Sequence, residues 1–183
     1  MPGRILVPFQ HKQHWWRSIS SYPLIDNLCR LICCPLFFIF YKYRANSKVY
    51  GVDSRIDFVC ADAYHVLAAL TPGISGIPAP KSKDNEWPPR VDVILLAPPW
   101  GGPDYTQKKH FDMSTDFPSG CGLELVRKAL LVCENVICVY PRNIKNSQVI
   151  SLCESVNAKC YVDEVILYKK HKLSVLYFGR MFN

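Results

Sequence analysis

The residues best suited to chemistry are an alanine, two prolines and a tryptophan at positions 97–100, followed by two glycines. Proline has no backbone N–H and a fixed φ angle, so the carbonyls of Ala97 and Pro98 can be held as acceptors for a donor on a ligand. Trp100 offers a flat aromatic face, and the glycines allow close approach. The pattern favours a planar ligand with an amino group, such as a nucleobase.

Two more polar residues follow apolar runs that are typical of strands: Asp62 and Arg142. A guanidinium suits phosphate, whereas an aspartate at a strand-to-helix turn either caps the helix or contacts a ligand, and both roles stay open. A positively charged base would gain a cation–π attraction of about 0.5–2 kcal/mol from Trp100. The structural alternatives are a proline pair that only ends a strand and a tryptophan that only packs.

The elements that position these residues alternate between strand and helix. Apolar periodicity predicts a helix that ends at Gly51 and further helices over residues 63–70, 122–133 and 145–156. Strands are expected at residues 56–62, 91–96, 136–140, 160–168 and 173–178. The order predicts an α/β fold with a doubly wound sheet and an antiparallel edge strand. In such sheets ligands bind beyond the carboxyl ends of the strands, where positions 62, 97–100 and 141–143 fall.

The beginning of the chain differs in character from the rest. Residues 1–50 hold 7 Lys or Arg against 1 acidic residue, which accounts for most of the net charge of +7. Residues 31–41 form an apolar run too short to span a bilayer, so the protein is expected to be soluble and intracellular. A buried strand is expected over residues 35–41. Residues 71–90 contain five prolines, which indicates a surface insertion.

Composition excludes several classes. At 183 residues with 49% hydrophobic and 20% charged residues, the chain suits one folded domain rather than a disordered tail or a coiled coil. Nine cysteines, an odd number with no Cys-x-x-Cys pair, are expected to be reduced core thiols. The adjacent cysteines 33 and 34 supply only half of a tetrahedral metal site, so no metal is expected.

The run Asp-Val-Ile-Leu-Leu-Ala-Pro-Pro-Trp-Gly-Gly-Pro-Asp-Tyr at residues 92–105 resembles the trimethylguanosine synthase family of RNA cap methyltransferases. Residues 44–52, 56–62, 140–143 and 177–179 are similar to the same family in the same order, so the resemblance covers about residues 43–180. It implies a class I, Rossmann-like fold. It also implies methyl transfer from S-adenosylmethionine to the exocyclic amine of a 7-methylguanosine cap on small nuclear and nucleolar RNAs, which gives 2,2,7-trimethylguanosine.

The resemblance implies a role for each matching residue. The catalytic positions are Ala97, Pro98 and Pro99, which would hold the amine for in-line attack. The cap would be bound by Trp100, Arg142, Asn143 and Asn46. The cofactor would be bound by Asp62, Ala63 and Pro98, with Asp62 and Ala63 bordering its adenine. Catalysis would rest on positioning and electrostatics.

The chain departs from the family pattern in two places. Ala97 stands where the family usually has serine. Gly3 and Asp26 are the single glycine and the single acidic residue before position 51, so the glycine-rich loop after the first strand and the acidic residue after the second have no counterpart. We therefore expect a sheet that is incomplete at the N-terminus and lacks its first two strands, with a divergent segment at 1–42 and a partial methyltransferase domain at 43–183.

Three functions follow as hypotheses. The first is the cap guanosine-N2 methyltransferase, located in the nucleolus or Cajal body of the nucleus and also in the cytoplasm. The second is a catalytically impaired, truncated isoform that is at most a cap-binding module. The third is an amino-methyltransferase acting on another base, because Pro-Pro-aromatic sequences resemble those of adenine and DNA amino-methylases. Membranes are not expected as partners.

Overall fold

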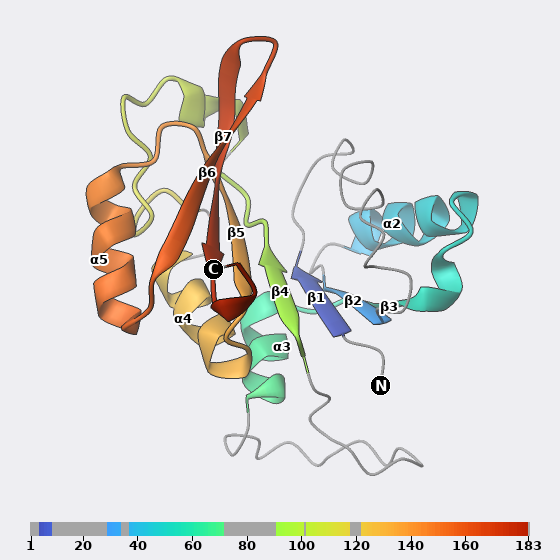
Figure 1. Ribbon diagram of the computed structural model, residues 1–183. Coiled ribbons are helices and arrows are strands. Elements are labelled where there is room, and N and C mark those ends of the chain that lie inside the picture. The colour runs from blue at the N-terminus through green and yellow to red at the C-terminus, as the bar shows by residue number, and fades with distance from the viewer. Residues whose placement is uncertain are drawn as a thin grey trace.

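The part of the chain that the structure describes forms a seven-stranded sheet flanked by helices (Figure 1). The computed structural model describes residues 4–8, 29–33, 37–71, 91–100, 102–117 and 122–182. The strands are β1 Arg4–Pro8, β2 Cys29–Cys33, β3 Ile56–Val59, β4 Val93–Leu96, β5 Val136–Pro141, β6 Cys160–Leu167 and β7 Lys170–Phe178. The insertion expected at 71–90 lies, apart from its first residue, outside the described residues.

The sheet order is β3-β2-β1-β4-β5-β7-β6. Strands β1 to β5 are parallel, whereas β7 is antiparallel to both β5 and β6. The doubly wound sheet with an antiparallel strand near its edge is therefore confirmed. Because the order reverses between β1 and β4, the crevice where such sheets bind ligands is expected at the carboxyl ends of these two strands.

The expectation that the first two strands are missing is wrong. β1 pairs with β2 from Arg4↔Cys29 to Pro8↔Cys33 and with β4 at Leu6↔Ile94, while β2 pairs with β3. Both edges that would have been left open are thus occupied. The two segments are short apolar runs without alternation, so pairing with distant strands decides their conformation. The division of the chain at residue 42 stays a prediction.

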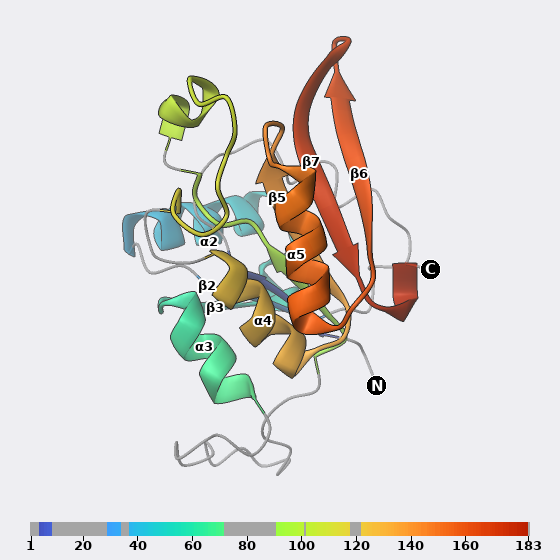
Figure 2. The ribbon, with the colours of Figure 1, turned by 90° about the vertical axis from the view of Figure 1, so that its left-hand side faces the viewer.

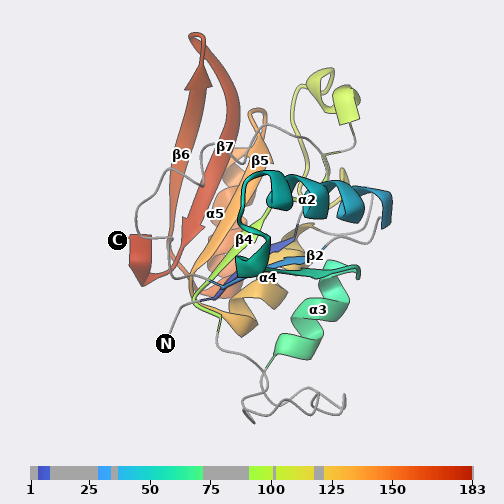
Figure 3. The same cartoon turned by 90° about the vertical axis from the view of Figure 1, so that its right-hand side faces the viewer.

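The helices of the described residues are α2 Phe37–Val49, α3 Ala63–Leu70, α4 Gly122–Val132 and α5 Asn146–Val156, with short 3₁₀ turns η2 Asp53–Arg55, η3 Gly102–Thr106 and η4 Arg180–Phe182. Figure 2 shows α3, α4 and α5 side by side on one face of the sheet. Figure 3 shows the opposite side, where α2 lies in front. α2 packs on β3. No described helix is both long and apolar enough to cross a bilayer.

The buried strand expected at residues 35–41 is wrong, because α2 begins at Phe37 and Tyr41 is 56% exposed. Periodicity cannot separate a short strand from a helix in a run that is apolar throughout. The predicted end of this helix is confirmed. Gly51 has φ +63°, and the N–H of Val52 donates to the carbonyl of Ser47 at 3.0 Å, as in a glycine-terminated helix.

The main core lies between the sheet and helices α3 to α5. Its fully buried side chains include Leu67, Ile94, Leu96, Tyr140 and Phe178. A smaller cluster on β5 and β7 contains Val139, Leu173 and Val175. These two clusters fix β4 and β5 relative to each other, and therefore fix the loops that follow them.

The expectation of reduced core thiols holds for part of the described chain. Cys133 and Cys138 are buried and form no disulfide bond, whereas Cys60 is exposed. The sulfurs of Cys153 and Cys160 lie 3.2 Å apart. Burial, followed by the neighbouring Cys153, raises the pKa of Cys160 to about 12, so this thiol stays protonated at neutral pH. Within the described ranges, no three potential ligands gather to hold a metal ion.

Candidate functional site

The carboxyl edge of the sheet brings three of the predicted segments to one side of the molecule. Asp62 follows β3, residues 97–100 follow β4, and residues 142–143 follow β5. β4 and β5 are neighbours, so their loops adjoin. β3 lies three strand spacings from β4, about 14 Å at 4.7–4.9 Å per spacing. Asp62 therefore lies at a different part of this edge from Trp100 and Arg142.

Trp100 is partly buried and is held by three contacts. Its indole N–H donates to the carbonyl of Val139 on β5 at 3.2 Å. The ring of Tyr105 lies perpendicular to it, with centroids 5.3 Å apart and planes at 81°. The indole also packs against both core clusters. These contacts fix the plane of the ring without burying it completely, which is what a stacking surface requires.

Arg142 is exposed at the end of β5, three residues beyond the strand position that accepts the indole N–H. Three strand residues span about 10 Å. The indole thus contacts β5 at Val139, and Arg142 extends from the end of the same strand, an arrangement that suits a base at one position and phosphate at the other. Ala97, Pro98 and Pro99 are each partly exposed beside them. Their catalytic roles stay predictions.

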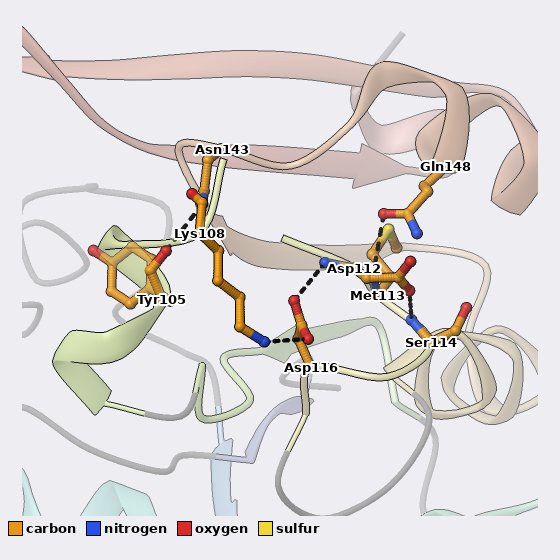
Figure 4. A network of polar contacts seen from close by, with 8 residues as sticks. All are labelled: Tyr105, Lys108, Asp112, Met113, Ser114, Asp116, Asn143 and Gln148. Carbon is orange, nitrogen blue, oxygen red and sulfur yellow. Dashed lines mark hydrogen bonds and ion pairs between the residues drawn. The ribbon is translucent and has the colours of Figure 1, made fainter. Parts of the chain in front are cut away.

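The loop of residues 102–117 contacts Trp100 through Tyr105. Asn143 holds this loop in place (Figure 4). The amide nitrogen of Asn143 donates to the carbonyls of Tyr105 at 3.0 Å and Lys108 at 2.9 Å. Its backbone carbonyl accepts from the N–H of Phe111 at 2.9 Å. Asn143 thus ties both the start and the middle of the loop to the end of β5.

This contact changes the interpretation of Asn143. Both of its amide hydrogens face carbonyl oxygens, which only accept, so the orientation of the amide is fixed by chemistry. Its Oδ1 is buried and has no hydrogen-bond partner among the described residues. The direct contact with a ligand implied by the resemblance stays a prediction. The role in positioning the loop was not found from the sequence, because it depends on two carbonyls 35 and 38 residues away.

The same loop is fastened by two carboxylates. Asp116 accepts from the N–H of Asp112 at 2.9 Å and from the ammonium of Lys108 at 2.5 Å. Asp112 accepts from the N–H of Ser114 at 2.8 Å. The N–H of Met113 donates to Gln148 of α5 at 3.3 Å, which joins the loop to that helix.

These bonds make the loop sensitive to acid. The N–H of Asp112, and then Lys108, hold the pKa of Asp116 below its ordinary value of 3.8. Because the folded pKa is the lower one, the stabilisation is complete above about pH 4 and is lost as the pH falls through the folded pKa. We expect Asp116→Asn to lower stability at pH 7 and to match the wild type at acid pH, as measured by thermal unfolding across pH. A difference that does not shrink as the pH falls below the ordinary pKa of 3.8, or one equal to that of the exposed control Asp163→Asn, would contradict this.

The remaining predicted residues lie on or next to α2 and α3. The carboxylate of Asp62 caps α3 by accepting from the N–H of Tyr64 at 2.8 Å, so the capping role is confirmed and the ligand role stays a prediction. Ala63 is the first residue of that helix. Asn46 lies on α2, where its carbonyl accepts from the N–H of Tyr50 at 3.1 Å. Its predicted contact with the cap is untested.

The fold and the strand-end site define the class of protein. The chain is similar in structure to the human methyltransferase 10 domain containing protein, with a TM-score of 0.57 and 15% identity over 98% of this chain and 72% of the other. It is also similar to TrmK of M. capricolum, a structure in complex with S-adenosyl-homocysteine, with a TM-score of 0.56 and 12% identity over 97% of this chain and 62% of the other. The fold is that of class I methyltransferases.

The sequence assigns the family within this class. A family model described as RNA cap guanine-N2 methyltransferase matches residues 39–181, and the chain belongs to that family. The match begins after β2 and includes every segment from which the resemblance was recognised. The family consists of S-adenosylmethionine-dependent methyltransferases, so S-adenosylmethionine is the cofactor that the family implies.

The residues at the carboxyl edge fit this cofactor incompletely. β1 and β2 stand where a class I sheet requires them, with Pro8↔Cys33 as their last pair. The chain that follows β1 contains no glycine before position 51, and β2 is followed by Cys34 and Pro35, neither of which is a carboxylate. The ribose contact made by an acidic residue in this class thus has no counterpart at the end of β2. The strand positions are retained, but the residues expected to hold the ribose are not.

Proposed function

We propose that this protein methylates the exocyclic amine of guanine in the 7-methylguanosine cap of small nuclear and small nucleolar RNAs, with 2,2,7-trimethylguanosine as the product. Membership of the RNA cap guanine-N2 methyltransferase family supports this. The single observation that carries it is the indole of Trp100, anchored through its N–H to β5 directly after the double proline. We further propose that it acts in the nucleus, with a second pool in the cytoplasm.

Each part of the site has one task in this proposal. Trp100 stacks on the cationic base. The perpendicular ring of Tyr105 holds the indole in place for this stacking. The carbonyls of Ala97 and Pro98 accept hydrogen bonds from the amine and hold its nitrogen in line for transfer. Arg142 meets the phosphates at the end of the neighbouring strand. The chain itself therefore binds and orients the cap.

Methyl transfer is tested with labelled S-adenosylmethionine and two short RNAs that differ only in the 7-methyl group of the cap. We expect label in the cap guanine of the 7-methylated RNA, at the exocyclic nitrogen, after digestion and chromatography. The unmethylated cap, which carries no positive charge on the base, is expected to accept at least ten times less label, the effect of about 1.4 kcal/mol of cation–π attraction. Label in adenine instead would support the third hypothesis and contradict this one.

A second candidate function is cap binding without methyl transfer. The observation that favours it is the pair Cys34 and Pro35 after β2, where the ribose-binding carboxylate is expected. Calorimetry separates the two functions. The binding module predicts heat with 7-methylguanosine triphosphate and none with millimolar S-adenosylmethionine, whereas the enzyme predicts heat with both.

A further inference from the structure

The hairpin of β6 and β7 extends well beyond the rest of the sheet. The last pair between β5 and β7 is Pro141↔Leu173, whereas β6 and β7 continue to pair as far as Leu167↔Lys170. Three residues of strand beyond Leu173 correspond to about 10 Å. Figures 1 and 2 show this tip rising past the sheet on the same side as η3 and the loop of residues 102–117. It therefore overhangs the carboxyl edge that carries the candidate site.

The turn at the tip has an unfavourable backbone. Tyr168 and Lys169 have φ values of 53° and 60°, so two consecutive residues with side chains adopt the left-handed conformation. Two-residue hairpin turns of this kind usually contain asparagine or aspartate followed by glycine, since other residues are strained there. Such strain is retained where the side chains at those positions have a use. Tyr168 is 95% exposed, so that use is not packing within the chain.

The composition of the tip favours a polyanion. Residues 165–173 contain three lysines, at positions 169, 170 and 172, and no acidic residue. All three lysines are exposed, and Ile166 and Leu167 next to them are 61% and 52% exposed. The nearest acidic residues along the chain are Asp163 and Glu164, which pair with Val175 and Ser174 further from the tip of the hairpin. An exposed aromatic ring among lysines is the combination that binds single-stranded nucleic acid.

A β-bulge and a side-chain contact of His171 fix the backbone of the tip. The pairing shifts between Val165 and Ile166, which leaves Lys172 as an extra residue on β7 and increases the local twist. The Nε2 of His171 donates to the carbonyl of Leu173 at 2.9 Å and lies 3.2 Å from the hydroxyl of Ser174. This contact braces the irregular section of β7. The lysines are thus presented from a defined backbone.

We propose that the tip of the hairpin, residues 166–172, binds the RNA chain that follows the cap. Arg142 directly follows Pro141, which pairs with Leu173 at the base of the tip. An RNA chain that continues from Arg142 along the hairpin therefore meets Lys172, Lys170 and Lys169 in turn. The lysines contact phosphates, and Tyr168 stacks on a base. This inference rests on the proposed function, because it takes the cap to lie between Trp100 and Arg142. The exposed apolar residues alone would suit a protein partner, but three lysines without a carboxylate favour RNA.

The test compares two ligands, a capped RNA of about ten nucleotides and 7-methylguanosine triphosphate alone. The variant is Lys169→Gln with Lys170→Gln. Its matched control is Lys128→Gln with Lys159→Gln, which makes the same change of charge on α4 and at the opposite end of β6. We expect the hairpin variant to bind the capped RNA about tenfold more weakly, with a salt slope reduced by about 1.4, and to bind the cap nucleotide unchanged. Tyr168→Ala should also lower the affinity for the capped RNA by about tenfold, while the thermal stability of the protein stays unchanged.

Three results would overturn the proposal: equal losses in the hairpin and control variants, unchanged RNA affinity in Tyr168→Ala and the lysine variant, or a capped RNA that binds no better than the cap nucleotide. A failure of the proposed function looks different. In that case the wild type does not bind the cap nucleotide, while an uncapped RNA still binds through the lysines of the tip.

Discussion

Trp100→Ala is expected to weaken binding of 7-methylguanosine triphosphate by about tenfold to a hundredfold. The change removes a stacking surface worth about 1–3 kcal/mol per base and the cation–π attraction to the methylated base. It also removes the hydrogen bond to Val139 and part of the packing on both core clusters. Calorimetry with the cap nucleotide measures the loss.

Trp100→Phe serves as the matched control, because it keeps an aromatic face and loses the N–H donor. We expect it to retain most of the affinity, with a modest loss from the missing anchor on β5. Tyr161 is an exposed aromatic residue on β6, remote from the carboxyl edge. Tyr161→Ala is therefore expected to leave the affinity for the cap nucleotide unchanged. If Trp100→Ala binds as the wild type does, the indole packs within the fold and is not a binding surface.

Asn143→Ala is expected to release the loop of residues 102–117 from β5. It leaves the carbonyls of Tyr105 and Lys108 without their donor, at a cost of about 2 kcal/mol. For a chain of this length, that lowers the midpoint of thermal unfolding by about 4–8 °C. Amide exchange in residues 105–111 should accelerate, and the affinity for the cap should fall because Tyr105 no longer braces the indole.

Asn143→Asp is the sharper variant, because it keeps the shape of the side chain and replaces the donor by an acceptor. Two carbonyls and a carboxylate then face one another, so we expect a larger loss than with alanine. Asn146→Ala, an exposed substitution at the start of α5, is the control and should change the unfolding midpoint by less than about 2 °C. Equal effects of the three substitutions would show that Asn143 does not hold the loop.

The sequence predicted the part of the fold that local signals determine. The helix expected at 63–70 is found at Ala63–Leu70, because Asp62 supplies the cap and the apolar residues repeat at helical spacing. Gly51 likewise marks the end of α2. The rule for parallel sheets placed residues 97–100, after β4, and residues 142–143, after β5, at one edge of the sheet. The observed topology confirms this.

What the sequence did not predict depends on distant partners. β1 and β2 are five residues each and acquire strand structure by pairing with β4 and β3. The apolar run before Tyr43 satisfies both helix and strand patterns, so its periodicity did not separate the two. Asn143 and Gln148 carry no local signal for the loop they hold. The family motif did include Tyr105, but not its perpendicular contact with the indole.

The central claim is that the carboxyl edge of this sheet binds a 7-methylated guanine between Trp100 and Arg142. The most direct test is to titrate the protein with 7-methylguanosine triphosphate and with GTP, and to follow tryptophan fluorescence in the wild type and in Trp100→Phe. The account predicts quenching in the wild type, at least tenfold tighter binding of the methylated nucleotide, and loss of the quenching in the variant. Equal affinities for the two nucleotides, or the same quenching in the variant, would contradict it.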